Sequence, residues 1–192
     1  MKQKTNRRRN GFSLIEIMIV VVVMGILAAL IVPQFSKAAD KAKAARIVAT
    51  ADALKSACTR YYTDTGTLAL EYGSDSYATA THHRLSMDQS TSGWNGPYLD
   101  DPMTKAENPF GTYAYLYATI HSSAGGGFDL TGSGTDTHTT GNSLLLNNVP
   151  EEAAEQVDAM IDGGGVGGGD WKTTGRVEWT SSGQLVILIF SP

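Results

Sequence analysis

The sequence predicts an α+β protein, in which a long N-terminal helix packs on a head that contains an antiparallel β-sheet. Three observations support this fold class. Residues 12–32 form a nearly unbroken apolar run, residues 36–62 continue at helical spacing, and the remainder contains short strand patterns separated by turn residues. We therefore divide the chain into a basic segment, a membrane-inserting helix, an amphipathic stem helix and a soluble head, at residues 1–11, 12–35, 36–62 and 63–192.

Charge is distributed unevenly along the 192 residues, whose formal net charge is −4. The first eleven residues carry +5, residues 37–60 carry +4, and residues 63–192 carry −12. An acidic head argues against nucleic-acid binding by that part of the chain. The single cysteine, Cys58, excludes an intrachain disulfide and is expected to be a buried apolar side chain.

The apolar run from Phe12 to Val32 is long enough to cross a membrane as a helix, because a span needs about 20 residues. The basic residues that precede it predict a cytoplasmic N-terminus. A cleaved secretory signal peptide ending at Ser36-Lys37-Ala38 is the alternative. The length of the run, Pro33 and the helical pattern that continues beyond it favour a retained helix.

The start of the chain resembles the signal of type IV prepilins and type II secretion pseudopilins. Basic residues precede Gly11 and Phe12, Glu16 follows, and Pro33 interrupts the apolar run, so the resemblance covers residues 6–35. It implies that a prepilin peptidase cuts between Gly11 and Phe12, removing the basic leader, and that the new Phe12 amine is methylated. The same resemblance implies that Glu16 pairs with this amine in its own chain or a neighbour during assembly; the alternative is a carboxylate that reaches the lipid headgroups.

Pro33 lacks a backbone N–H and should kink or locally melt the helix, with Gly25 as a second weak point. Beyond it, residues 36–62 are rich in alanine and contain neither glycine nor proline. The apolar stripe that we expect to pack on the sheet consists of Ile47, Ala51, Leu54, Cys58 and Tyr61. The helix should end near Asp64-Thr65-Gly66.

After a polar stretch that we interpret as loop (residues 72–83), residues 93–117 contain prolines, a turn at 108–111 and the start of an aromatic strand predicted for 112–120. This block resembles the major pseudopilin of type II secretion, in which a Trp-x-Gly-Pro-Tyr-Leu segment precedes a Pro-x-Gly turn. The matching residues are Trp94, Gly96, Pro97, Tyr98, Leu99, Pro109, Gly111, Tyr113 and Tyr115.

Two groups of residues are weak metal-site candidates. The major pseudopilin has a short acidic calcium-binding loop after this strand, whereas the present chain continues with a Gly/Ser/Thr-rich segment. Asp129 and Asp136 could bind calcium there, but their spacing fits no EF-hand, so we interpret the segment as a solvated loop. His82-His83 could bind a transition metal, but the pair has no nearby cysteine or histidine partner and is expected to be polar surface.

The C-terminal region predicts a helix followed by a hairpin. Val149-Pro150 and two acidic residues begin the helix, which ends at Gly163. Its expected apolar face consists of Ala153, Val157, Met160 and Ile161. The glycine-rich residues 163–169 predict a flexible loop, and 176–180 with 184–190 predict a closing hairpin whose last, apolar strand is central in the sheet.

No catalytic constellation is present in the sequence, so we expect no enzymatic activity and no cofactor apart from the calcium alternative. The pattern predicts a structural subunit of a pilus-like filament, first a type II secretion pseudopilin. The alternatives are a type IV pilin for adhesion, twitching or DNA uptake, and a single-pass anchored binding protein or enzyme. The resemblance implies the inner membrane as the location, with an exported head that joins a periplasmic pseudopilus or a surface pilus. Expected partners are further copies of the chain, minor pilins or pseudopilins, prepilin peptidase, the assembly platform and membrane lipid.

Overall fold

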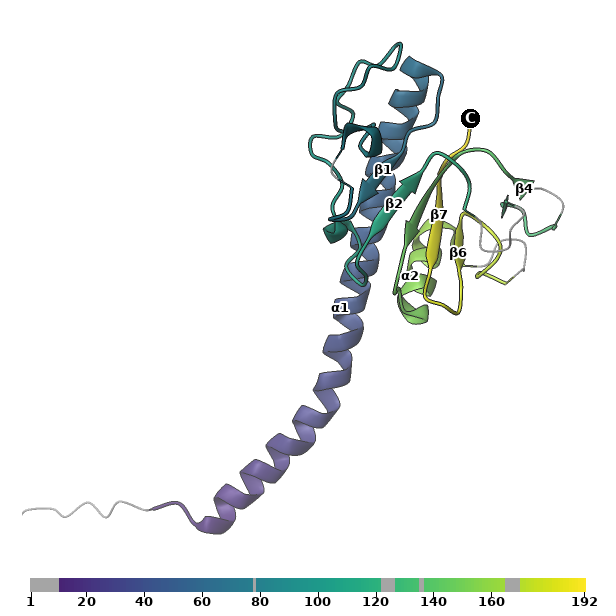
Figure 1. Cartoon of the computed structure of the whole chain (residues 1–192). Coiled ribbons are helices and arrows are strands. Elements are labelled where there is room, and N and C mark those ends of the chain that lie inside the picture. The colour runs from purple at the N-terminus through teal and green to yellow at the C-terminus, as the bar shows by residue number, and fades with distance from the viewer. Residues whose placement is uncertain (1–10, 78, 122–126, 135–136, 165–169) are drawn as a thin grey trace, which may run out of the picture. The chain divides into compact units, whose positions relative to one another are not determined.

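Figure 1 shows the computed structural model of the chain, which describes residues 11–77, 79–121, 127–134, 137–164 and 170–192, with backbone only at 31–36 and 137. The helices are α1 (Leu14–Thr65) and α2 (Glu151–Ile161), with 3₁₀ turns η1 (Ala80–His82) and η2 (Lys105–Glu107). The strands are β1 (Glu71–Gly73), β2 (Ala114–Tyr117), β3 (Phe128–Asp129), β4 (Thr137–His138), β5 (Asn142–Leu146), β6 (Val177–Trp179) and β7 (Leu185–Phe190). The chain divides into two compact units, residues 1–39 and Asp40–Pro192, which we describe separately.

Helix α1 is one helix where the sequence suggested two adjoining segments. Its helical backbone continues through Pro33, so the chain does not melt at that residue here. The loss of helicity that the resemblance allows between Gly25 and Pro33 in a filament stays a prediction. At the other end α1 stops where the sequence predicts, because Gly66 adopts a φ of 65° and its N–H donates to the Tyr62 carbonyl at 2.8 Å.

The head contains the antiparallel sheet that the sequence predicts. Five strands lie in the order β1-β2-β5-β7-β6, and every neighbouring pair is antiparallel. Strand β7 lies between β5 and β6, so the prediction that the last strand is central is confirmed. The predicted strand at 112–120 is shorter, at Ala114–Tyr117.

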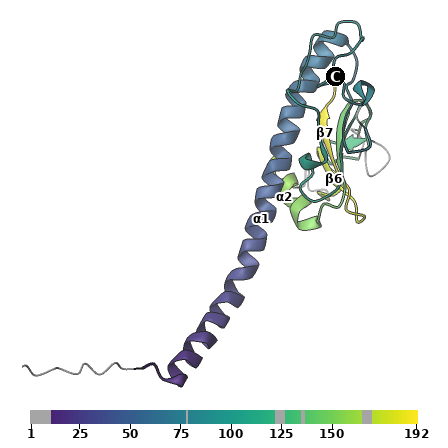
Figure 2. The ribbon, with the colours of Figure 1, turned by 60° about the vertical axis from the view of Figure 1, so that its left-hand side comes forward.

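One face of the sheet is covered by helices. The 40–65 part of α1 and helix α2 lie on the same face, as Figure 2 shows with the sheet nearly edge-on. The predicted stripe is confirmed, because Ile47, Ala51, Leu54, Cys58 and Tyr61 are all buried in this core. Inward-facing residues of the central strands, such as Leu144 and Ile187, complete it. On α2, Ala153 and Val157 are buried as expected, whereas Met160 is 41% exposed.

The opposite face carries a smaller apolar cluster. Phe128 from the two-stranded β3–β4 ribbon packs with Leu145, Val186 and Leu188 of the main sheet. Strand β5 therefore buries side chains on both faces, which explains why its sequence lacks the alternation typical of a half-exposed strand.

Candidate functional site: the capped helix start and the loops on the stem

The predicted processing site lies immediately before helix α1. Gly11 and Phe12 are exposed and belong to no helix or strand, and the helix begins at Leu14. The Ser13 hydroxyl accepts a hydrogen bond from the Ile15 N–H at 3.4 Å, and the Glu16 carboxylate accepts one from the Ser13 N–H at 2.7 Å. Ser13 thus caps the first turn through the Ile15 N–H, and Glu16 reaches back to the Ser13 N–H, which is one half of a Ser-x-x-Glu capping box.

The side chains that follow have no core of their own. The large apolar residues from Phe12 to Leu30 are between 46% and 85% exposed, on all faces of the helix. A soluble protein rarely exposes so large a continuous apolar surface, so another molecule must cover this segment in use. Across the described residues, no helix has both the length and the mean hydropathy required of a membrane span.

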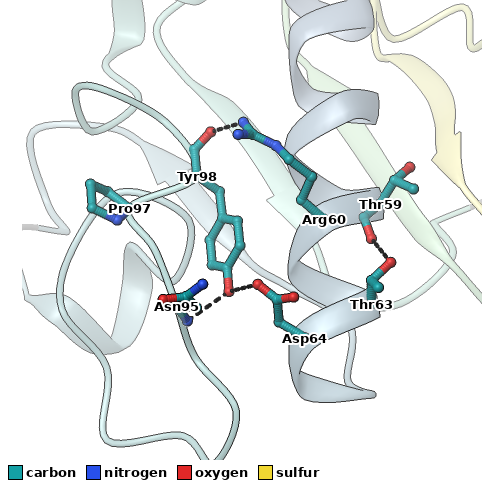
Figure 3. Close-up of a pocket in the computed structure, with 7 residues that line it drawn as sticks. All are labelled: Thr59, Arg60, Thr63, Asp64, Asn95, Pro97 and Tyr98. Atoms are coloured by element: carbon teal, nitrogen blue, oxygen red, sulfur yellow. Dashed lines mark hydrogen bonds between the residues drawn. The ribbon is translucent and has the colours of Figure 1, made fainter.

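In the head, the Trp94–Leu99 block docks on the last turns of α1. Figure 3 shows Tyr98 lying against the helix between Arg60 and Asp64. The Arg60 guanidinium donates to the Tyr98 carbonyl at 2.7 Å, and the Tyr98 hydroxyl donates to the Asp64 carboxylate at 2.8 Å. The same hydroxyl accepts the Asn95 N–H at 2.9 Å. These contacts line a cavity of about 300 Å³ between the loop and the helix.

Ring packing and close backbone approach fix this loop. The Tyr98 ring meets Tyr61 edge-on at 5.5 Å between centroids and Trp94 at 6.0 Å. Gly93 has a φ of 83°, and a Cβ there would meet the Asp64 carbonyl oxygen, so only glycine fits at this contact. The residues that resemble the major pseudopilin therefore hold the head loop on the stem helix.

A buried polar network that the sequence analysis missed holds the preceding loop. The Glu71 carboxyl group is hydrogen-bonded to His83 Nδ1 at 2.7 Å, and it accepts hydrogen bonds from the Ser86 hydroxyl at 2.6 Å and from the Leu85 N–H at 2.9 Å. His83 Nε2 donates to the Tyr77 carbonyl at 2.8 Å. Both ring nitrogens of His83 therefore have partners, and the buried pair ties the loop that contains His83 to strand β1.

The expectation that both histidines of the pair form polar surface is therefore wrong for His83. Its side chain is buried beneath the loop, and only His82 is partly exposed. Distance in sequence explains the error, since Glu71 lies twelve residues away from its histidine partner. Within the described residues, no cluster of three or more acidic, histidine or cysteine side chains could hold a metal ion.

The Asp129 carboxylate lies in a tight turn. Its carboxylate accepts hydrogen bonds from the backbone N–H groups of Gly134, Gly132 and Thr131 at 2.7, 2.9 and 3.2 Å. These donors, Gly134 first, lower the pKa of Asp129 below its usual value. Asp136 lies outside the described residues, so the calcium alternative stays a prediction.

Cys58 is buried in the core between α1 and the sheet, as its place in the predicted apolar stripe of the stem helix requires. Burial raises the pKa of its thiol. A protonated, buried thiol is a packing group, in contrast to the thiolate of a reactive cysteine.

Comparisons with known proteins agree with the helix start and with part of the head. Residues 6–32 match the family model for the prokaryotic N-terminal methylation motif, and residues 38–127 match the model for PilW, C-terminal. No solved structure gives a significant match.

Curated relatives fall into two groups by name. The chain is 62% identical over 37 residues to type II secretion system core protein G of Pseudomonas aeruginosa, covering 19% of this chain and 26% of that protein. The Klebsiella michiganensis protein of the same name is 44% identical over 64 residues, covering 33% and 43%. A fimbrial protein of Neisseria meningitidis is 34% identical over 91 residues, covering 47% and 54%.

The chain thus spans about a quarter to a half of the length of these relatives. Their names are those of fimbrial and secretion proteins and not of enzymes. The methylation-motif match covers Gly11, Phe12 and Glu16, the residues on which the sequence analysis based its resemblance. The motif also implies that the protein is membrane-associated. The chain therefore carries the N-terminal motif of the type IV pilin and type II secretion pseudopilin superfamily, and the recognition of that superfamily from the sequence is confirmed.

Proposed function

We propose that this protein is a structural subunit of a type IV pilus-like filament. The observation that carries the proposal is the helix from Leu14 to Leu30, whose apolar side chains are exposed on every face and begin directly after the Gly11–Phe12 bond. Before assembly, membrane lipid covers these side chains. After assembly, the corresponding helices of other copies cover them, and burial of apolar area supplies the cohesion.

The proposed maturation gives Glu16 its role. Prepilin peptidase cuts between Gly11 and Phe12, and the new Phe12 amine is methylated. The Glu16 carboxylate already receives the N–H of Ser13, the residue next to Phe12. A positive amine formed at Phe12 therefore appears beside a carboxylate of the same chain. Burying the two charges together costs less than burying either alone.

Within the superfamily, we place the protein first among the pseudopilins of type II secretion. The Trp94–Leu99 block supports this placement because it docks on the stem through the residues that resemble the major pseudopilin. The head then lies in the periplasm with the N-terminus in the cytoplasm. An inner-membrane assembly platform and minor pseudopilins are the further partners.

A type IV pilin is the second candidate. Residues 38–127 match the PilW C-terminal model, and one relative is a fimbrial protein. Both candidates share processing and polymerisation, and they differ in whether the filament ends in the periplasm or at the cell surface.

Mass spectrometry of the membrane-extracted protein tests the processing. The expected species begins with N-methylated Phe12, and an intact leader in wild-type cells contradicts the proposal. Electron microscopy of surface filaments and analysis of secreted proteins in a deletion strain then separate the candidates. Loss of secreted proteins with unchanged surface filaments supports the pseudopilin, and loss of filaments with normal secretion supports the pilin.

A further inference from the structure

The bond that the proposed peptidase cuts lies at a sharp change of backbone conformation. Gly11, Phe12 and Ser13 are outside any regular element, and helix α1 begins with the next residue. In a helix, the groups flanking a peptide bond are hydrogen-bonded along the axis and crowded by side chains. A peptidase must reach both sides of the bond it cuts, and this short non-helical stretch leaves the Gly11–Phe12 bond accessible to it.

Ser13 determines where helix α1 begins. Its hydroxyl accepts the Ile15 N–H at 3.4 Å, and its own N–H donates to Glu16. Serine is among the strongest N-cap residues, whereas alanine is the best helix former and a poor cap. An alanine at position 13 removes this N-cap and favours extension of the helix toward the N-terminus, over Phe12 and Gly11.

We propose that Ser13 is a positioning residue for leader cleavage: by capping helix α1, it keeps the Gly11–Phe12 bond in a non-helical, exposed backbone. The inference rests on the proposed function, since it concerns the same processing step. In that step a water molecule adds to the Gly11 carbonyl carbon and the carbon–nitrogen bond to Phe12 breaks. Gly11 leaves as a carboxylate, and the Phe12 nitrogen takes up the proton as an amine.

The test is a series of substitutions at one position, measured as cleavage rates with membranes containing prepilin peptidase. Ser13→Ala should be cleaved about fivefold more slowly, the ratio expected when a typical cap is lost. Ser13→Gly and Ser13→Asp should remain within about twofold of wild type, because glycine resists helix extension and aspartate is a strong cap. Ser56→Ala, the same change at an exposed site within α1, is the matched control and should cleave normally.

The series distinguishes capping of the helix by Ser13 from direct recognition of the Ser13 hydroxyl by the peptidase. If the enzyme contacts the hydroxyl, Ser13→Thr keeps the rate while the Gly, Asp and Ala variants are equally slow, and the inference is overturned. Equal rates for every variant overturn it as well. Amide hydrogen exchange of the unprocessed chain gives an independent readout. Ser13→Ala should increase the protection of the Ile15 and Glu16 amides, which an extended helix would bond to the Gly11 and Phe12 carbonyls.

The fate of the wild-type chain distinguishes this inference from the proposed function. A wild-type chain cut after Gly11, with no difference between Ser13→Ala and Ser13→Gly, removes the positioning role and leaves the proposed function intact. A wild-type chain that is not cut there removes both.

Discussion

The two halves of helix α1 have the same backbone conformation and opposite surroundings. Between residues 14 and 30 apolar side chains point in all directions and remain exposed, whereas between 44 and 61 one apolar stripe is buried and the other faces are exposed. The periodicity of the side chains, not the helix itself, accounts for the difference. The protein's own sheet can cover a single stripe, but a helix that is apolar on every face can be covered only by another molecule.

The largest expected effect concerns the one carboxylate within the apolar half. Glu16→Ala should still be cleaved but fail to assemble, because the Phe12 amine is then buried without a partner, at a cost of about 3–5 kcal/mol. The measurement is the yield of filaments sheared from cells and seen by electron microscopy. Wild-type yields would show that the carboxylate only reaches the headgroups, and the two halves would then differ less than we argue.

Removing the buried partner of Glu71 tests how much a polar pair contributes to the stability of the head. His83→Ala leaves the buried Glu71 side chain without its histidine partner, and the free energy of unfolding should fall by up to about 3 kcal/mol. His82→Ala is the control: it removes ring contacts with Tyr72 and Tyr77 from a partly exposed histidine and leaves Glu71 paired, so its effect should be the smaller. Urea unfolding followed by tryptophan fluorescence measures both. A similar loss for both variants would show that the pair does not hold the loop.

Matched leucines in the two halves of α1 test the comparison itself. Leu54 is buried in the head core, so Leu54→Ala should lower the free energy of unfolding of the head by about 2–5 kcal/mol. Leu27 is half exposed, and Leu27→Ala should leave head unfolding in detergent unchanged. If Leu27→Ala destabilises the head, the two halves are not independent.

Tyr98→Phe probes the contact between the head loop and the stem end. It removes the hydroxyl that joins Asp64 to the Asn95 N–H and should cost about 1–3 kcal/mol in the same unfolding experiment. Tyr62→Phe, at a tyrosine that packs on Phe190, is the control. An equal effect at both positions would mean that the hydrogen bonds add nothing beyond ring packing.

The smallest effect is expected from the cations on the exposed faces of the stem. Lys41, Arg46 and Lys55 are exposed and make no ion pair with any described residue, whereas Lys43 already contacts Asp40 and the Phe110 ring. These cations can attract the acidic heads of neighbouring copies during assembly, and each such surface pair contributes about 0–1 kcal/mol. Replacing Lys41, Arg46 and Lys55 together with glutamate should therefore slow assembly. Added salt should narrow the difference from wild type. Equal assembly rates at low salt would show that these charges only keep the helix soluble.

Local patterns predicted much of the fold. The stripe ending at Tyr61, the stop at Gly66 and the closing hairpin all depend on neighbours within a few residues, and the structure confirms them. Strand β5 was missed because three leucines within a polar stretch give no alternation to recognise. Strand β1 was missed because its Glu-Tyr-Gly sequence resembles a loop.

The candidate sites likewise differ in whether a local sequence pattern predicts them. The Ser-x-x-Glu spacing of Ser13 and Glu16 is a local capping signal and could have been recognised from the sequence. Glu71 gives no such signal, because its donors extend as far as the Met103 N–H, 32 residues away. Only the folded sheet brings these groups to one carboxylate.

The central place of β7 has a consequence for the order of events during synthesis. This strand is made from residues 185–190 and lies between β5 and β6, so until the ribosome has passed residue 190 strand β6 has no partner and β5 is paired only with β2. The inner-face core also lacks Leu185, Ile187 and Ile189 until then. The apolar helix is made first, while the head is still an open chain. Formation of the helix and closure of the head are thereby separated in time, and we expect a nascent chain stopped before β7 to have no protease-resistant head.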